Sequence, residues 1–394
     1  MTIKLYLLPD FKDIDHANDI LNRICWGLLG LPSGEAILSV NFEVTSGILI
    51  RPDRLGSISL PVSQESYLSG LPSIIDMENN KVLDSESFEI YWDSVSYFDQ
   101  KTVEWEKHRL LIDPYYLFNR EADQVAALQY SLLNNGQRIL LENDCLSKYK
   151  EFQDRWSGVK DAYLYLTGPT VESVQEQSVD KNGLKIICNS LVKNISLLQH
   201  IQPNVLMFSD PAYHFGVSKY AASFRKFVME AMLFFPDLLC IVPERYYPLT
   251  SAFLGKEFSQ RILGMPIVIM DKFNFPTIKE FFVRKTENIL SLLMIPIASS
   301  VTSTIHITGA DGRRKNDNGY WAHAKTSQIS DLLKTIYETH PSLARDECVE
   351  NYYKEHCLQL EELLNYGETI HQKVYYCQSQ SIIPALAKRM AAEY

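Results

Sequence analysis

From Val159 onward, short apolar segments alternate with segments of helical periodicity, and no other feature of the sequence restricts the fold as much. Strands that alternate with helices form parallel sheets whose faces are covered by those helices. The sequence therefore predicts an α/β fold with a Rossmann-like parallel sheet, helices on both faces and a helical C-terminal region. We expect this domain to comprise residues 158–394.

The expected strands are short and mainly apolar, as in a sheet buried on both faces. They fall at residues 162–166, 184–188, 205–208, 238–242, 267–270 and 304–307. The expected helices fall at residues 171–177, 219–235, 281–293, 327–338, 348–366 and 383–393. The even spacing of the first three strands predicts that their carboxyl ends lie side by side along one edge of the sheet.

Residues 1–157 show a mixed pattern and are predicted to form a separate α+β subdomain. Residues 3–8 fit a strand, and residues 121–133 fit a helix. Residues 37–60 alternate apolar and polar positions, which indicates antiparallel strands. No motif in this part of the chain indicates a chemical reaction.

The acidic balance of the chain argues against broad nucleic-acid binding. Lys and Arg number 38 and Asp and Glu 48, a net charge of −10, whereas nucleic acid requires a basic surface. The N-terminus lacks the apolar core of a signal peptide, and no window reaches ~18 uninterrupted apolar residues. The seven cysteines form no CxxC pair, and the Cys and His residues show no metal-ligand spacing. We therefore expect a cytoplasmic protein with reduced thiols and no metal.

The turns that follow the first three expected strands contain candidate binding residues at equal intervals. Gly168, Asn189 and Asp210 are spaced 21 residues apart. Ligands and catalytic side chains gather at the carboxyl ends of strands in such sheets. In the turn Thr167-Gly168-Pro169-Thr170, the glycine permits close backbone approach and the helix N-terminus that follows favours an anion.

The segment around Asp210 is the strongest candidate for chemistry. Ser209 and Asp210 follow a buried strand, and Pro211 ends that strand and removes one backbone donor. The carboxylate is therefore expected at a fixed point on the edge of the sheet. The alternative is that Asp210 only caps the turn. His214 is predicted to orient Asp210 or to transfer a proton, with an ordinary loop histidine as the alternative.

The order of these motifs resembles that of sialyltransferase-like glycosyltransferases, which use CMP-activated sugars. Its elements are the Gly168-Pro169 turn, Asn189, the Asp210-Pro211 pair and the later turn Thr308-Gly309-Ala310-Asp311. The resemblance covers roughly residues 159–394. It implies a sialyltransferase-like fold in which these turns hold the donor nucleotide.

One departure from that family changes the expected chemistry. The family commonly has Asn-Pro where this chain has Asp210-Pro211, and a carboxylate beside the anomeric carbon can act as a nucleophile with net retention. In this respect the chain resembles the retaining β-Kdo transferases of bacterial O-antigen and lipopolysaccharide assembly, which take 3-deoxy-manno-octulosonic acid (Kdo) from CMP-Kdo. The resemblance implies an enzyme without a cofactor other than its CMP-sugar donor.

The acceptor implied by the resemblance is an oligosaccharide or a lipid-linked glycan, and residues 1–157 would lie on the acceptor side. A lipid-linked acceptor predicts peripheral contact with the inner membrane or with other polysaccharide-synthase components. The donor-binding residues implied by motif order and position are Gly168, Pro169, Thr170, Asn189, Ser190, Ser209, Gly309, Asp311, Tyr320, Ser379 and Ser381.

The C-terminal third adds candidates that each have a structural alternative. His340, in His340-Pro341-Ser342, resembles the His-Pro element of bacterial sialyltransferases, where the histidine assists the departure of CMP; otherwise it ends a helix. Ser379 and Ser381 precede a helix with Pro384 in its first turn, so they are expected to cap it and also to bind the donor phosphate.

Two further positions are expected near the donor or acceptor. Arg313, within GADGRR, is suited to an anionic group, with a solvated turn as the alternative. Tyr320 and His323, in YWAH, are predicted to reach the phosphate.

Three other functions stay open from the sequence. The first is an inverting sialyltransferase with Asp210 or a histidine as general base. The second is a pterin pyrophosphokinase-like protein linked to flagellin glycosylation, a class that shares the Gly-Pro turn and the Asp-Pro pair. The third is a non-catalytic glycan-binding subunit of a polysaccharide synthase.

Overall fold

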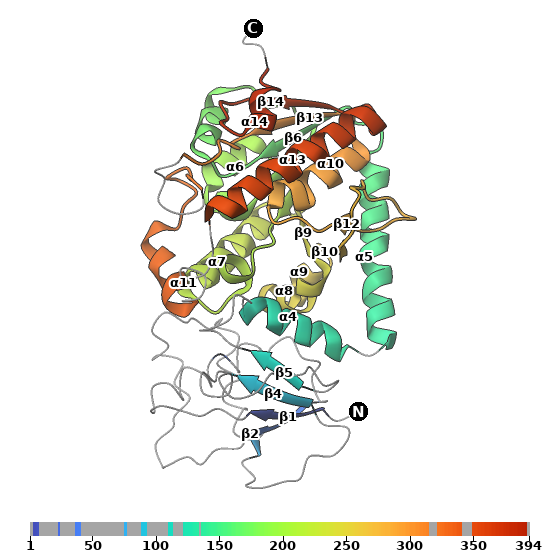
Figure 1. The fold of residues 1–394 in the computed structure, drawn as a ribbon, viewed down its shortest axis with the longest axis vertical. Helices are drawn as coiled ribbons and strands as arrows, with labels where there is room; N and C mark the ends of the chain where they lie inside the picture. The colour runs from blue at the N-terminus through green and yellow to red at the C-terminus, as the bar shows by residue number, and fades with distance from the viewer. Residues whose placement is uncertain are drawn as a thin grey trace.

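The described residues form two large parallel sheets, a smaller one near the N-terminus and a larger one that is surrounded by helices, and a separate two-stranded sheet (Figure 1). The computed structural model describes residues 3–7, 23, 36–40, 75–76, 88–92, 109–112, 121–133, 135–314, 321–340 and 349–391. The larger sheet has seven strands in the order β10-β9-β8-β7-β6-β13-β14, and each adjacent pair is parallel. The predicted α/β, Rossmann-like fold is therefore confirmed.

The strands of the larger sheet are β6 (Asp161–Tyr165), β7 (Leu184–Cys188), β8 (Val205–Met207), β9 (Leu239–Pro243), β10 (Ile262–Met265), β13 (Thr304–Thr308) and β14 (Val374–Cys377). From β6 the chain first builds the sheet in one direction, through β7 to β10. It then returns to place β13 and β14 on the other side of β6. The carboxyl ends of β6 and β13 therefore lie at the topological switch point, where open α/β sheets bind ligands.

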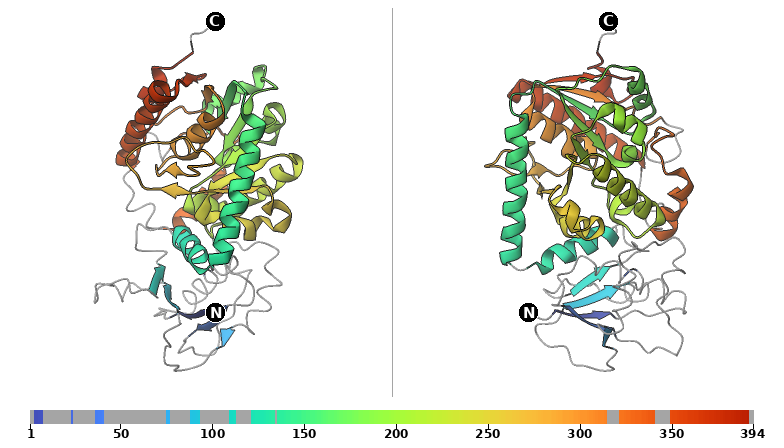
Figure 2. Two further views of the ribbon diagram at one scale, coloured as in Figure 1. Left: turned by 90° about the vertical axis from the view of Figure 1, so that its right-hand side faces the viewer. Right: turned by 180° about the vertical axis from the view of Figure 1, so that it is seen from behind.

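Helices cover both faces of this sheet (Figure 2). One face packs against α6 (Ile195–Ile201) and α7 (Lys219–Phe234), and the other against α5 (Asn135–Trp156), α10 (Ile295–Val301) and α13 (Val349–His371). All five residues of β7 are buried, as expected for a central strand covered on both sides. Within the described residues, no helix combines the length and the apolar character needed to cross a membrane.

Apart from α4 (Glu121–Leu132), which has 12 residues, the remaining elements are short. The other α-helices are α8 (Tyr247–Leu254), α9 (Lys256–Ser259), α11 (Leu333–Thr339) and α14 (Pro384–Ala387). The tighter or wider helical turns are η3 (Pro169–Glu176), η4 (Asn189–Lys193), η5 (Pro211–Phe215), η6 (Glu244–Tyr246), η7 (Leu290–Met294) and η8 (Ser330–Leu332). Two further strands, β11 (Ile267–Val268) and β12 (Val283–Arg284), pair with each other.

The smaller sheet corrects one expectation. Its strands are β1 (Ile3–Leu7), β2 (Ala36–Val40), β3 (Ile75–Asp76), β4 (Phe88–Trp92) and β5 (Arg109–Ile112), in the order β3-β2-β1-β4-β5. All four pairings are parallel, so the predicted antiparallel strands are wrong for residues 37–40. The rest of the range 37–60 lies outside the described residues. Alternation of apolar and polar positions reports which face is buried and not the direction of the neighbouring strand.

Two helices that precede residue 157 pack into the cores of the larger sheet. Val125 and Ala126 of α4 belong to the apolar cluster on the α7 face, and Tyr149 and Phe152 of α5 belong to the cluster on the opposite face. Figure 1 shows α5 running along the side of the larger sheet. The sequence predicts α4 but not α5.

The segment after β10 differs from its predicted structure. The strand expected at residues 267–270 is only the two-residue β11, and β10 supplies the fifth strand of the sheet instead. The helix expected at residues 281–293 begins late, because β12 occupies its first part and the helical turns η7 and α10 run from 290 to 301. Short apolar runs do not distinguish buried strands from buried helices.

A buried ion pair connects Arg23 to the larger domain. Arg23 Nη1 lies 2.7 Å from Glu121 Oε2 at the start of α4, and the two side chains are 2% and 0% exposed. Arg23 Nη2 also donates to the Thr339 carbonyl at the end of α11, at 3.1 Å. One guanidinium therefore joins three segments that are distant in sequence.

We expect Glu121→Gln to lower the thermal unfolding midpoint clearly. Removing one partner of a buried ion pair leaves an uncompensated charge and costs about 3–5 kcal/mol. The control is Lys226→Ala, which removes an exposed pair with Glu230, 3.8 Å apart and with side chains 70% and 45% exposed. Exposed pairs contribute at most about 1 kcal/mol. Equal midpoints for the two variants would contradict the structural role of Arg23.

Candidate functional site

The turns after β6 and β13 are in direct contact at the switch point. The Gly168 N–H donates to the Gly309 carbonyl at 2.9 Å. The Asp311 carboxylate accepts from the Thr170 N–H at 2.9 Å and also from the Thr170 hydroxyl. The structure thus brings together the two turns that the sequence assigned separately to the donor.

This contact requires glycine on both sides. A Cβ on Gly168 would lie 2.5 Å from the Gly309 carbonyl oxygen and 2.8 Å from Asp311 Cγ. Gly309 itself has φ +78°, a conformation that other residues rarely adopt. Burial raises the pKa of the Asp311 carboxyl above its usual range, although the two bonds from Thr170 oppose this rise. Pro169 begins η3 and is exposed beside this junction.

The C-terminal segment packs against the same junction. Ser379 Oγ accepts from the Gly309 N–H at 3.2 Å, and the Ser381 hydroxyl donates to the Ala310 carbonyl at 2.6 Å. The Ile382 N–H donates to the Asp311 carbonyl at 2.9 Å. Both serines therefore border the turn after β13, next to the turn after β6.

The predicted capping role of these serines is wrong. The residue that caps α14 is Ile383, which makes no side-chain capping bond, and the helix ends at Ala387 and not near residue 393. Ser381 Oγ accepts from the Ile383 N–H at 3.2 Å, before the helix begins. The serines bind the neighbouring turn instead, because β14 delivers them alongside β13.

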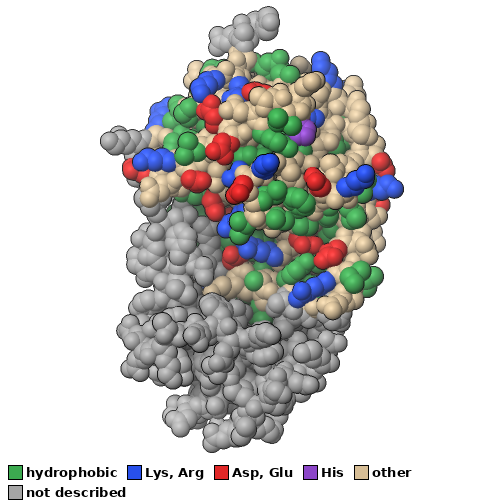
Figure 3. Space-filling model, turned by 45° about the vertical axis from the view of Figure 1, so that its right-hand side comes forward, with side chains coloured by type: hydrophobic (Ala, Val, Ile, Leu, Met, Phe, Trp, Pro, Cys, Tyr) green, Lys and Arg blue, Asp and Glu red, His purple; other side chains and the backbone are tan. Residues whose placement is uncertain are grey.

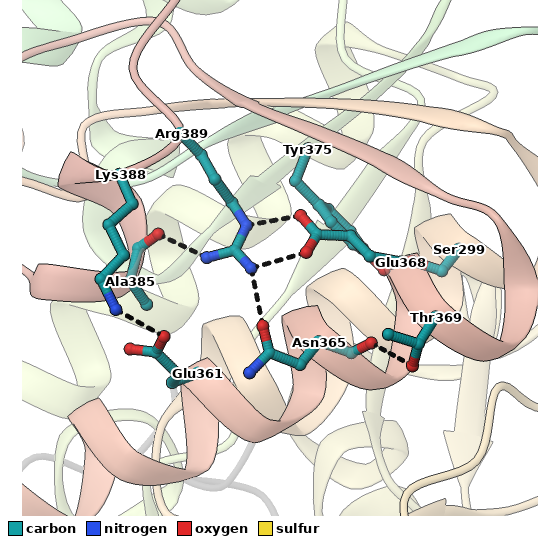
Figure 4. A network of polar contacts seen from close by, with 9 residues as sticks. All are labelled: Ser299, Glu361, Asn365, Glu368, Thr369, Tyr375, Ala385, Lys388 and Arg389. Atoms are coloured by element: carbon teal, nitrogen blue, oxygen red, sulfur yellow. Dashed lines mark hydrogen bonds and ion pairs between the residues drawn. The ribbon is translucent and has the colours of Figure 1, made fainter.

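A polar network fastens this C-terminal segment to α13 (Figure 4). The Arg389 guanidinium donates to both carboxylate oxygens of Glu368, at 2.6 and 2.7 Å, and to Asn365 Oδ1 at 2.9 Å. Lys388 pairs with Glu361 at 2.8 Å. The Cys377 N–H also donates to the Arg389 carbonyl at 2.8 Å. The network thus closes the loop that holds Ser379 and Ser381.

Asn189 and Ser190 follow β7, the next strand along the edge. Asn189 has φ +49°, a left-handed conformation, and its side-chain Oδ1 is buried with no hydrogen-bond partner among the described residues. A buried acceptor without a donor is costly, so this oxygen is suited to accept a hydrogen bond from a bound molecule. Ser190 is buried near the Tyr220 hydroxyl at the start of α7, which donates to Gln328 Oε1 at 3.2 Å. The sequence did not single out Tyr220.

Asp210 follows β8, and its carboxylate caps η5. Its Oδ1 accepts from the N–H groups of Ala212 and Tyr213, at 3.0 and 3.1 Å. The capping alternative is therefore present in the structure, and it fixes the orientation of the carboxylate. Ser209 and Asp210 are half-buried at the same edge of the sheet as Asn189.

His214 belongs to this loop, and its side chain is buried. Its ring is 4% exposed and packs against Phe208 and Phe224, with ring centroids 5.5 and 4.4 Å away. Its Nδ1 accepts from the Asp210 backbone N–H at 3.0 Å, so it reaches Asp210 through the main chain and not through the carboxylate. Burial lowers the pKa of His214 to about 4, which keeps the imidazole neutral at pH 7.

His340 lies beside the same loop. It directly follows α11, its N–H donates to the Ile336 carbonyl at 2.7 Å, and its side chain is buried. A Cβ on Gly216, at the end of the Asp210 loop, would lie 2.9 Å from His340 Nε2. The structure therefore brings His340 to the Asp210 loop, across 130 residues of sequence (340 − 210).

Residues 321–324 run past the end of β6. The Ala324 N–H donates to the Thr167 carbonyl at 2.7 Å, which places His323 close to the Gly168 turn. Burial lowers the pKa of His323 to about 4, and its Nδ1 has no hydrogen-bond partner in the described part of the chain. Tyr320 lies outside the described residues.

Arg313 lies in the turn that follows Asp311. Its backbone hydrogen-bonds to the Tyr353 hydroxyl on α13, and the residue is half-buried. Trp321 packs on the same helix, against Tyr353 and His356, with ring centroids 5.6 and 5.3 Å away.

Across the described ranges, no group of three or more His, Cys, Asp or Glu side chains is placed to hold a metal ion. On the face shown in Figure 3, acidic and basic side chains are interspersed among hydrophobic ones. Comparison of the chain with protein-family models, with curated proteins and with solved structures finds no match.

We expect Gly168→Ala to destabilise the protein by about 1–3 kcal/mol, the usual cost of forcing extra atoms into a packed site. The new Cβ would meet backbone that cannot rotate away. Gly255→Ala is the control for backbone strain without a clash, since Gly255 has φ +87° and no atom lies within 4 Å of the position that a Cβ would take. Thermal unfolding of both variants measures the difference. A Gly168→Ala protein as stable as wild type would contradict the tight junction between the two turns.

Proposed function

We propose that the protein is a glycosyltransferase that moves a 2-keto sugar acid, Kdo, from a CMP-activated donor to a bacterial surface glycan with retention. The observation that supports this most is the hydrogen-bonded junction of Gly168, Thr170, Gly309 and Asp311 at the switch point. Asn189 and Asp210 stand at the ends of the next two strands along the same edge.

The donor nucleotide would bind over this junction. Ser379 Oγ accepts from the Gly309 N–H, which leaves its own O–H to donate to a phosphate oxygen. The buried Asn189 Oδ1 would accept from the nucleoside, and the Gly168 turn would let the ligand approach the backbone closely. His323 and Arg313 border the same turns and would contact the donor or the acceptor.

Transfer would proceed in two displacements. The Asp210 carboxylate would attack the anomeric carbon, and the electron pair of the broken C–O bond would leave with the CMP phosphate, near His340. An acceptor hydroxyl would then attack the same carbon, lose its proton to solvent and release the carboxylate. Two inversions give net retention. His214, buried and neutral, would support the Asp210 backbone.

We expect CMP to raise the thermal unfolding midpoint in a screen that also contains UMP, ADP and GDP. A ligand at 100 times its dissociation constant stabilises the folded state by about 2.7 kcal/mol. Asn189→Ala should lose this response. The control is Gln202→Ala, which replaces another left-handed residue, with φ +55°, and should retain it. Equal responses to all four nucleotides would contradict the donor assignment.

We expect Asp210→Asn to reduce transfer from CMP-Kdo by about 10³-fold or more, because the nucleophile is lost. An asparagine oxygen can still accept from Ala212 and Tyr213, so folding and CMP binding should persist. Asp237→Asn, an exposed site at the opposite edge of the sheet before β9, serves as the control. Wild-type transfer by Asp210→Asn would exclude Asp210 as the nucleophile.

Three further measurements separate the other functions. An inverted product anomer, measured by NMR, would indicate a sialyltransferase-like single displacement with a general base. A thermal response to ATP with magnesium but not to CMP would indicate a pyrophosphokinase. Binding of acceptor glycan without consumption of CMP-sugar would indicate a glycan-binding subunit.

A further inference from the structure

Arg225 of α7 is a buried cation that reaches into the Asp210 loop. Its side chain is 5% exposed. Its Nη1 donates to the carbonyls of His214 and Gly216, at 3.2 and 2.8 Å. These carbonyls belong to the last residues of the loop that begins at Asp210. One guanidinium nitrogen therefore fixes the end of that loop at two points.

The surroundings of Arg225 are apolar. The guanidinium carbon lies 4.1 Å from the centroid of the Phe253 ring, and Nη2 has no hydrogen-bond partner among the residues that the structure describes. The side chain lines a small cavity together with Phe208, His214 and Thr250. Burial lowers the pKa of Arg225 to about 9, so the side chain remains charged at pH 7. Burying a charge there is unfavourable, and the two carbonyl bonds and the Phe253 ring offset that cost only in part.

The bonds from Arg225 continue through His214 to Asp210. The His214 N–H donates to the Asp210 carbonyl at 3.1 Å, and the Asp210 N–H donates to His214 Nδ1 at 3.0 Å. His214 thus joins Asp210 by two bonds, and Arg225 holds the His214 carbonyl. A shift of that carbonyl would move the backbone that carries the Asp210 carboxylate.

We propose that Arg225 is a positioning residue for the transfer reaction, holding Asp210 at the distance and angle that attack requires. The inference rests on the proposed function. Within the described ranges, the hydrogen bonds of Arg225 all go to the Asp210 loop, and none goes to the Gly168 or Gly309 turns. Its loss should therefore lower kcat and leave the KM for the donor almost unchanged.

The test compares Arg225→Met with Arg261→Met. Arg261, directly before β10, is only partly buried, but it also binds main-chain carbonyls at the other end of α7. Its Nη1 donates to those of Met232, Phe235 and Pro236 at 2.8, 3.1 and 3.0 Å. It also lies over an aromatic ring, with its guanidinium 5.3 Å from the Phe258 centroid. Transfer from CMP-Kdo gives kcat and KM, and hydrogen–deuterium exchange reports the mobility of residues 209–217.

We expect Arg225→Met to lower kcat at least about tenfold, since small displacements of a reacting group can cost ~10²-fold in rate. The KM for CMP-Kdo should stay within about twofold, and exchange in residues 209–217 should accelerate. Arg261→Met should keep the wild-type kcat and the wild-type exchange in this segment. Arg225→Lys, which keeps the charge but loses the planar fork, should show the same changes in smaller measure.

An Arg225→Met protein with wild-type kcat would overturn the inference, as would one whose kcat loss also appears in Arg261→Met. If Arg225→Met does not fold, Arg225→Lys decides on the same criteria. Absence of transfer by the wild type would refute the proposed function and with it the role in transfer. The exchange data would then show separately whether Arg225 holds the loop.

Discussion

The contact between the Gly168 turn and the turn that contains Gly309 and Asp311 determines the arrangement of the candidate site. Two backbones can approach this closely only where no Cβ intervenes, and the Thr170–Asp311 bonds fix the two turns in register. β13 lies on one side of β6 and β7 on the other. The contact therefore forms at the point where the order in which the chain adds strands to the sheet reverses. The C-terminal segment then has a defined surface to pack on, and it places Ser379 there.

The site consists of two halves with separate supports. The turns after β6 and β13 depend on each other and on the C-terminal segment, which Arg389 and Glu368 fasten to α13. The Asp210 loop depends instead on α7, through Arg225, and on the end of α11, through His340. The halves meet at β7 and Asn189. Under the proposed function, substitutions in the first half should affect nucleotide binding, and substitutions in the second should affect turnover.

The sequence predicted the residues that stand at strand ends, because position after a buried strand is a local property. Gly168, Asn189 and Asp210 fall at the edge that the strand spacing indicated, and Asp311 follows β13 at the same edge. Contacts set by tertiary packing could not be predicted. An arginine in a helical segment looks like a solvated charge, and only the packed structure shows that Arg225 is buried. The edge strand β14, whose residues alternate between exposed and buried, was not predicted from the sequence.

The capping and catalytic interpretations of Asp210 are compatible, and capping has a chemical consequence. Both amide bonds go to Oδ1, so attack through Oδ2 would keep them throughout the reaction. Amide donors stabilise negative charge on a carboxylate, which slows the attack but assists its release in the second displacement. In the proposed transfer CMP is a good leaving group, so the first step would tolerate a weaker nucleophile. A capped aspartate therefore suits a reaction in which the same carboxylate must both attack and depart.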